Sequence, residues 1–160
     1  MPFPDVADRA ESRLSAPANR DHLWEIYSPP RIGPGVRRKG GLCSRSVDIG
    51  NFWDLTKSDS QHCLLSDVVS LMPFMLIMGP PCTMFCSLVF SNWFRMPEEI
   101  RVPRLREAVM LADVAVWLAT LQVDRSEYYV LENPEGSQLW TRENVTWLQS
   151  GPTCHCLLTN

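Results

Sequence analysis

The sequence has no excess of positive charge. Its 15 Lys and Arg residues are outnumbered by 18 Asp and Glu residues, so the 160-residue chain carries a net charge of −3 at pH 7. Proteins that bind nucleic acid by non-specific electrostatics carry a broad basic field instead. Any contact with nucleic acid must therefore be local. The one basic cluster lies in a glycine-rich segment and indicates either a solvated loop or a loop that contacts phosphate: Arg31, Arg37, Arg38, Lys39 and Arg45.

The amino terminus lacks the apolar core of a signal peptide. Its first residues include Asp5, Asp8, Arg9 and Glu11. A chain without an export signal stays in a reducing compartment, where cysteines remain thiols. We therefore expect an intracellular protein, nuclear or cytoplasmic, whose six cysteines are reduced.

Standard zinc-binding spacings are also missing. Cys82 and Cys86 are four residues apart, and Cys154-His155-Cys156 lies near the end of the chain. These spacings match no Cys-x-x-Cys pairing, and each cysteine is more simply a small buried hydrophobic residue. We expect no metal site.

One long segment, residues 68–94, has no charged residue and is long enough for a membrane-spanning helix. Pro73, Gly79, Pro80 and Pro81 break it into pieces that are too short to cross the membrane as one helix. A buried strand followed by a loop explains the same residues, so we expect no membrane insertion.

The chain is 45% hydrophobic, which is enough for one domain with its own core. Residues 1–20 are polar, contain three prolines and show no periodicity, so they predict a flexible lead-in. The domain is expected to cover residues 21–160.

Short apolar runs alternate with segments of helical periodicity along this domain. Such alternation predicts parallel strands joined by crossover helices, hence an α/β fold with a three-layer, mostly parallel sheet. The expected strands are His22–Tyr27, Arg45–Ile49, Phe74–Met78, Glu127–Leu131 and Cys154–Leu158, and the expected helices are Ser58–Met72 with Ser58 as N-cap, Pro103–Leu121 and Leu139–Gln149.

Unusual polar clusters follow four of the predicted strands. Parallel strands end at the same edge of their sheet, and ligands of such sheets bind beyond that edge. We therefore expect these clusters to converge there. They are Glu25 and Ser28, then Asp48, then Gly79-Pro80-Pro81-Cys82, and then Glu132-Asn133-Pro134.

The stretches "LIMGPPCTMFCSL" and "YYVLENPEGSQLW" together resemble the cytosine-C5 DNA methyltransferase family. That family has a Pro-Cys nucleophile motif after a central strand and a Glu-Asn motif after the next strand. The segment from Trp24 to Thr56 also resembles divergent methyltransferase-like segments that are found in some eukaryotic, retroelement-rich genomes. The resemblance covers residues 22–158 and implies a Rossmann-like methyltransferase core that is incomplete at its carboxyl terminus.

The resemblance implies chemistry for three residues. Cys82 matches the thiol that adds to C6 of a flipped-out cytosine, which makes C5 nucleophilic towards the methyl group of S-adenosylmethionine. Glu132 matches the carboxyl group that hydrogen-bonds or protonates N3, and Asn133 is expected to brace its loop. DNA and S-adenosylmethionine are the implied partners, together with partner segments that complete the site.

The residues that correspond to the family's cofactor-binding site match the family pattern less closely. "EIYSPPRIG" stands where the family has a glycine-rich turn, so prolines replace residues that let a ligand approach closely. Asp48 matches the acidic residue that binds ribose hydroxyls, and Asp54 the one that reads the adenine amino group. The expected cofactor set is Glu25, Ser28, Asp48, Phe52, Trp53, Asp54 and Pro81, with Phe52 or Trp53 stacking on the adenine ring.

Structural interpretations remain open for several of these residues. Cys82 is either a working nucleophile or an unreactive thiol after a buried strand. Asp48 and Asp54 are either cofactor ligands or turn residues beside Gly50-Asn51. At the level of the whole chain, the alternative to a truncated methyltransferase, inactive alone, is a non-catalytic remnant that serves as a binding or structural module of a mobile-element protein.

Overall fold

A computed structural model describes residues 22–41, 44–151 and 154 of the chain. The expected strand Cys154–Leu158 and the expected flexible lead-in 1–20 lie, apart from Cys154, outside these residues. The described part forms a four-stranded sheet in the order β2-β1-β3-β4, with every neighbouring pair parallel. The strands are β1 (Leu23–Ile26), β2 (Ser44–Val47), β3 (Met75–Met78) and β4 (Tyr128–Leu131).

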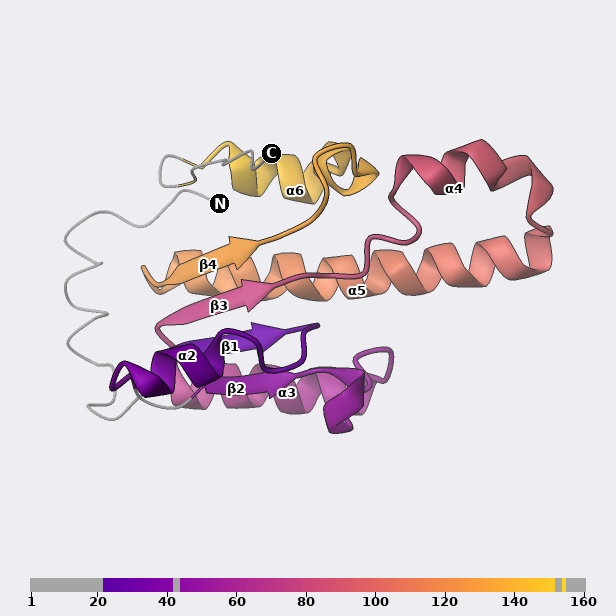
Figure 1. Cartoon of the computed structure of the whole chain (residues 1–160). Coiled ribbons are helices and arrows are strands. Elements are labelled where there is room, and N and C mark those ends of the chain that lie inside the picture. Colours follow the sequence, from indigo (N-terminus) through magenta and orange to yellow (C-terminus); the bar gives the residue numbers. More distant parts are fainter. Residues whose placement is uncertain (1–21, 42–43, 152–153, 155–160) are drawn as a thin grey trace.

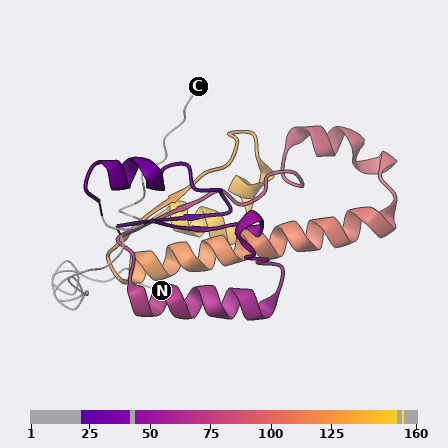
Figure 2. The same ribbon diagram turned by 60° about the horizontal axis from the view of Figure 1, so that its bottom comes forward.

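Helices cover both faces of the sheet. The short helix α2 lies on one face, and α3 and α5 lie side by side on the opposite face (Figure 2). The expected three-layer α/β arrangement is therefore confirmed, and its strand order is compatible with a Rossmann-like layout. The helices are α2 (Gly33–Arg38), α3 (Ser58–Leu71), α4 (Ser87–Asn92), α5 (Glu98–Asp124) and α6 (Glu143–Gln149).

The hydrophobic core lies between the sheet and the α3/α5 layer. Trp24 pairs with Leu76 in the register of β1 and β3, and Ile26 pairs with Met78; all four side chains are fully buried. Alternate strand residues point to the same face, so these four form one apolar layer. Each contributes about 1.5–3 kcal/mol by its removal from water. The core fixes the central strands, and therefore also the loops that leave their ends.

Helix α5 begins earlier than the sequence pattern indicated. Pro103 was expected in the first turn, yet the helix starts at Glu98, and Pro103 lies inside it. Pro97 precedes the helix, while Glu98 and Glu99 occupy its first turn, where carboxylates are favourable beside the positive end of the helix dipole. Pro103 lies beyond the first turn, so it removes one backbone hydrogen bond and crowds the carbonyl of Glu99, a cost of about 3 kcal/mol that the rest of the 27-residue helix offsets.

The basic cluster and the region after β4 also differ from the expectation. The cluster was expected in a loop, but Arg37 and Arg38 form the last turn of α2. Arg45 lies on β2, where it forms an ion pair with Asp67 and stacks over the ring of Trp24.

The expected helix Leu139–Gln149 is interrupted at Arg142, whose extended backbone separates a 3₁₀ helix from α6. Lys57, not Ser58, is the N-cap of α3.

No helix within the described ranges is both long enough and apolar enough to span a membrane. The uncharged segment 68–94 instead contains the end of α3, the buried strand β3, a loop and α4. Helix α4 was not expected from the sequence. It projects beyond the edge of the sheet beside the first half of α5 (Figure 1).

Tyr27 anchors the end of β1 to α5. Its backbone has φ 65°, a conformation that is an outlier for a bulky residue. Its hydroxyl donates a 2.8 Å hydrogen bond to the carbonyl of Leu111 in α5. Burial raises the pKa of this hydroxyl, so it stays protonated and remains a donor at neutral pH. The bond fixes where the chain turns away from the sheet after β1.

We predict that Tyr27→Phe lowers the free energy of unfolding by about 1 kcal/mol, because the side chain keeps its packing but loses the hydrogen bond to Leu111. Urea unfolding followed by tryptophan fluorescence measures the change. Tyr128→Phe is the matched control, since 45% of that residue is exposed to solvent. Equal losses in the two variants would contradict the anchoring role.

Candidate functional site

Three of the predicted polar clusters begin at the first residue after a strand. Asp48 follows β2, Gly79 follows β3 and Glu132 follows β4. Because the strands are parallel, these residues lie at one edge of the sheet, the edge to which the arrowheads point in Figure 1. The predicted convergence is confirmed for these three positions. This edge is where parallel α/β sheets bind their ligands.

The loop that carries Cys82 is hydrogen-bonded to the loop that carries Glu132. The backbone N–H of Glu132 donates to the carbonyl of Met78 (2.9 Å), and the side-chain Nδ2 of Asn133 donates to the carbonyl of Pro80 (2.9 Å). Further along both loops, the N–H of Gln138 donates to the carbonyl of Phe85 (2.8 Å). Hydrogen bonds therefore join the two loops on either side of Cys82.

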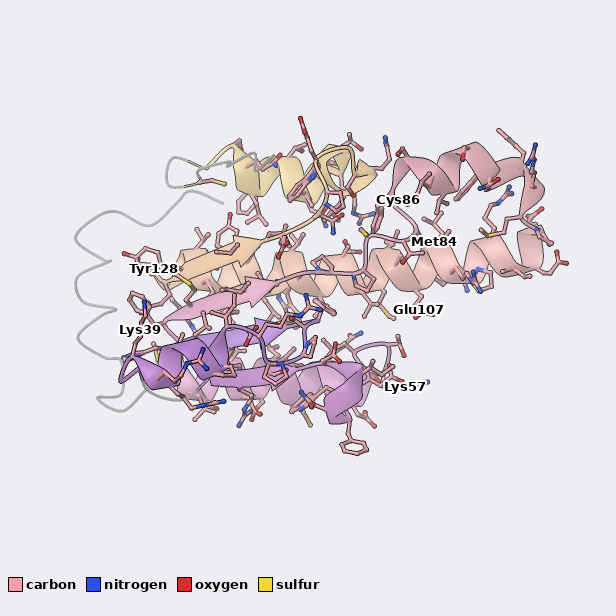
Figure 3. The ribbon with its side chains drawn as sticks, viewed as in Figure 1. Lys39, Lys57, Met84, Cys86, Glu107 and Tyr128 are labelled. Carbon is pink, nitrogen blue, oxygen red and sulfur yellow. The ribbon has the colours of Figure 1, made fainter. Side chains whose placement is uncertain are left out.

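Buried side chains on both sides of Cys82 also anchor its loop to the core. Pro80 is buried and Pro81 is exposed, so the proline pair turns the chain out of the core at the cysteine. Beyond Cys82, the side chains of Met84 and Phe85 return to the core, each only 4% exposed. Figure 3 shows Met84 and Cys86 where the chain leaves β3 and approaches α4.

The structure leaves both proposed catalytic groups accessible. Cys82 is a free, half-buried thiol, and Glu132 is exposed. A thiol and a carboxyl group on adjoining loops are the pair that nucleophilic addition with acid assistance requires. The side chain of Asn133 joins its own loop to the Pro80 loop.

Glu25 has a different position from the expected one. It lies inside β1, not after it, and only 1% of it is exposed. Its carboxylate folds over the following loop and accepts hydrogen bonds from three consecutive backbone N–H groups, those of Arg31, Ile32 and Gly33 (2.9–3.0 Å). Glu25 therefore holds the loop and the start of α2, and its carboxylate is not presented to a ligand.

One signal in the sequence points to this role. An acidic residue within an otherwise apolar strand needs partners in the interior, because a buried carboxylate without hydrogen bonds is very costly. The partners themselves were not predictable, since they are backbone groups six to eight residues away whose approach depends on the turn through Pro29 and Pro30.

Ser46 also belongs to this edge of the sheet, although no sequence pattern pointed to it. Its hydroxyl donates to the carbonyl of Ser28 (2.6 Å) and accepts from Nδ2 of Asn51 (2.9 Å). Ser28 itself, an expected cofactor residue, donates from its hydroxyl to the carbonyl of Pro29 (3.0 Å). These bonds tie the loop after β1 to the loop after β2.

Asp48 and Asp54 both act as turn residues, as the structural interpretation predicted. Oδ1 of Asp48 accepts from the N–H of Gly50 (2.9 Å) and caps a short 3₁₀ helix. Oδ1 of Asp54 accepts from the hydroxyl and the N–H of Thr56. The hydroxyl bond from Thr56, followed by the backbone bond, lowers the pKa of Asp54 below its usual range. Both carboxylates are therefore partly engaged within their own turns.

The same loop presents two apolar side chains to solvent. Phe52 is 98% exposed and adopts φ 67°, while Ile49, which follows Asp48 directly, is 74% exposed. Trp53 instead packs against the core and is half-buried. Of the two aromatic residues expected to stack on an adenine ring, Phe52 is the accessible one. Ile49 was not singled out in the sequence, although its position after an acidic residue at a strand end is a usable signal.

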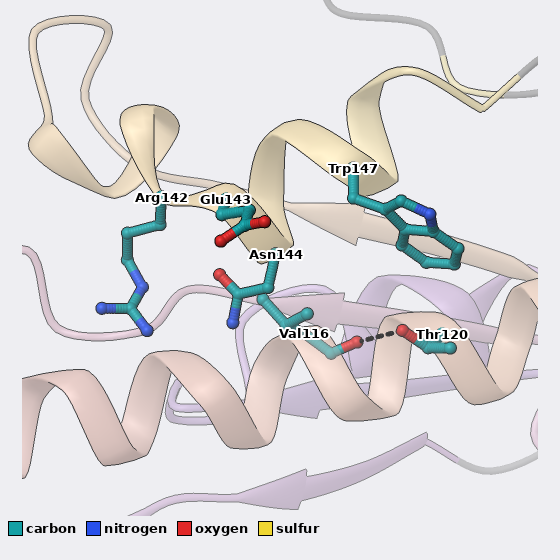
Figure 4. Close-up of a pocket in the computed structure, with 6 residues that line it drawn as sticks. All are labelled: Val116, Thr120, Arg142, Glu143, Asn144 and Trp147. Carbon is teal, nitrogen blue, oxygen red and sulfur yellow. Dashed lines mark hydrogen bonds between the residues drawn. The ribbon is translucent and has the colours of Figure 1, made fainter. Parts of the chain in front are cut away.

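A hollow between α5 and α6 is separate from these residues (Figure 4). Arg142 and Asn144 belong to it, and both donate hydrogen bonds to Oδ1 of Asp113 in α5 (2.5 and 2.8 Å). The sequence "RENV" (Arg142 to Val145) contains the letters of the Glu-Asn motif, but its Arg142 and Asn144 side chains bind Asp113 and so join α6 to α5. The hollow is lined by Val116, Thr120, Arg142, Glu143, Asn144 and Trp147.

We predict that Glu25→Gln lowers the free energy of unfolding by about 2 kcal/mol. The amide keeps the size of the side chain, but it loses charge-assisted hydrogen bonds and turns an NH₂ donor towards a backbone N–H. Chemical denaturation measures the change, and Glu135→Gln, at an exposed loop position, is the control. An identical unfolding midpoint in both variants would contradict the assigned role of Glu25.

Comparison of the chain with models of protein families, with curated proteins and with solved structures found no match in any of the three. The function must therefore be argued from the arrangement of the loops at the carboxyl edge of the sheet.

Proposed function

We propose that this chain is a DNA cytosine-C5 methyltransferase-like domain that uses S-adenosylmethionine, with Cys82 as the nucleophile. The observation that carries the proposal is the pair of loop-to-loop contacts, Asn133 to Pro80 and Gln138 to Phe85, which hold Cys82 next to the Glu132 loop. A thiol after one strand and a Glu-Asn pair after its neighbour are the two motifs that the sequence shares with that family.

In this proposal the Cys82 thiolate adds to C6 of a cytosine that has been turned out of its helix. Electron density moves through the ring towards N3, where Glu132 donates a hydrogen bond or a proton. C5 becomes nucleophilic and takes the methyl group, and the donor is left as a neutral thioether. Loss of the C5 proton to water then releases the Cys82 sulfur and restores the C5–C6 double bond. Asn133 is a positioning residue, because it acts on the Pro80 carbonyl and not on the base.

The residues present fit the adenosine part of the cofactor better than its amino-acid part. Asp48 stands at the end of β2, where a carboxylate accepts hydrogen bonds from ribose hydroxyls, and exposed Ile49 and Phe52 offer apolar surface for a purine ring. The N–H groups of residues 31–33, which in other folds receive an anionic ligand, already bind Glu25. When bound, the cofactor supplies an electrophilic methyl group. The carboxylate of S-adenosylmethionine must then be bound by groups other than these N–H groups. Recognition of the target DNA is left to the partner segments that complete the site.

The occupied N–H groups favour a second candidate function. A chain whose own carboxylate fills the anion-binding turn is suited to a non-catalytic module that keeps the fold without the cofactor. Cofactor binding separates the two candidates: quenching of the half-buried Trp53 by S-adenosylmethionine is expected for the enzyme and not for the remnant.

The nucleophile is tested by trapping. Full-length protein, cofactor and a duplex that contains 5-fluorocytosine should give a covalent adduct that survives denaturation, because fluorine at C5 blocks release of the enzyme after methyl transfer. Cys82→Ala should abolish the adduct, since it removes the attacking sulfur. The measurement is a mobility shift of labelled DNA on a denaturing gel.

Cys63→Ala is the control, because it removes an exposed thiol on α3 and should leave the adduct unchanged. Absence of adduct with the unmodified chain, while the cofactor still binds, would refute the role of Cys82 and leave the remnant as the better account.

A further inference from the structure

Two free thiols lie close together in the sequence at the proposed site. Cys82 is the first residue of a tight turn, and Cys86 follows the last residue of that turn. Cys82 and Cys86 are both half-buried. Between them, the N–H of Phe85 donates a 2.8 Å hydrogen bond to the carbonyl of Cys82 and closes a four-residue turn. Residues at the two ends of such a turn have their Cα atoms within about 7 Å of each other. Cys86 is the next residue after this turn.

The side chain of Cys86 folds back over the turn. Its Sγ donates to the carbonyl of Thr83, the residue after Cys82, at 3.4 Å. A thiol is a weak donor, so little is lost when the sulfur leaves this carbonyl. Disulfides join Cα atoms about 4.4–6.8 Å apart. Cys86 lies one residue beyond the end of the turn at Phe85, and its side chain already folds back to Thr83, so a local rotation of the chain at Cys86 is what closes the bond.

We propose that Cys82 and Cys86 form a reversible disulfide when the protein meets a hydroperoxide. The Cys82 thiolate attacks the outer peroxide oxygen, the O–O bond breaks, and the departing oxygen takes a proton and leaves as water or an alcohol. Cys82 is then a sulfenic acid. Cys86 attacks its sulfur, the S–S bond forms, and the hydroxyl group leaves as water with the proton of Cys86. The thiol pair loses two electrons and the peroxide gains them.

The consequence of this step rests on the proposed function. Sulfur bound to Cys86 cannot add to a pyrimidine, so oxidation would switch off the nucleophile and reduction would restore it. The disulfide itself does not depend on that function, because its formation needs neither nucleic acid nor cofactor.

The location of a methionine makes the bond easy to detect. Met84 lies between the two cysteines, and cyanogen bromide cleaves after methionine. Complete cleavage in acid separates Gly79–Met84, which contains Cys82, from Phe85–Met96, which contains Cys86. A disulfide between the cysteines holds these two peptides together until a reductant is added.

The experiment treats the reduced, full-length protein with a stoichiometric amount of hydrogen peroxide, blocks the remaining thiols, cleaves at methionine and analyses the peptides by mass spectrometry. The linked pair should be the main product of these two peptides, and dithiothreitol should release both. Cys86→Ser should remove the linked pair, whereas Cys63→Ser, at an exposed thiol on α3, should leave it.

Separate, unlinked peptides after oxidation would overturn the proposal, as would linkage of Cys82 to any other cysteine in preference to Cys86. The outcome is independent of the trapping experiment. A linked pair in a protein that traps no 5-fluorocytosine refutes the methyltransferase but not the disulfide, and an adduct in a protein that forms no linked pair refutes only the disulfide.

Discussion

The candidate site depends on the hydrogen bonds between two loops, above all the one from the amide of Asn133 to the carbonyl of Pro80. The parallel register of β3 and β4 brings the two loops to the same edge of the sheet, but register alone does not fix what lies beyond the strand ends. The Asn133 contact, with the second contact from Gln138 to Phe85, extends the pairing past the strands. A half-buried thiol and an exposed carboxyl group thereby lie on two loops that are hydrogen-bonded to each other. This juxtaposition is the physical basis of the proposed chemistry.

A buried charge organises the other half of the edge. The carboxylate of Glu25 is removed from water, and the three backbone N–H groups that follow in the next loop compensate for this cost. The same bonds define where α2 begins. They also consume the groups that an anionic ligand would use, so one interaction both stabilises the fold and limits what the site can bind. The two candidate functions differ in whether Asp48, Ile49 and Phe52 suffice to hold a cofactor without those groups.

The sequence predicted the sheet better than its connections. Apolar runs placed the four described strands to within about two residues. Strands β1, β2 and β3 contain buried positions, whereas the residues of β4 are exposed or half-buried. Helix α2 was missed because the backbone N–H groups at its start bind the carboxylate of Glu25, six to eight residues earlier, a contact that no helical periodicity marks. The start of α5 was misplaced because Pro103 resembles a first-turn proline, and only the carboxylates at Glu98 and Glu99 mark the real start. The residues around Ser46 likewise form no pattern that predicts its hydrogen bonds to Ser28 and Asn51.

The most direct test of the central claim is a chemical cross-link across the two loops. In a chain where Cys82 is the only native cysteine left, Glu132→Cys should react with a short bifunctional thiol reagent about as long as a pyrimidine ring and join the two loops. Asp124→Cys, at the end of α5 and the opposite edge of the sheet, should give no such link. Cross-linking at Glu132→Cys alone is the result that this account predicts. Failure at that position, or equal cross-linking at both, would contradict it.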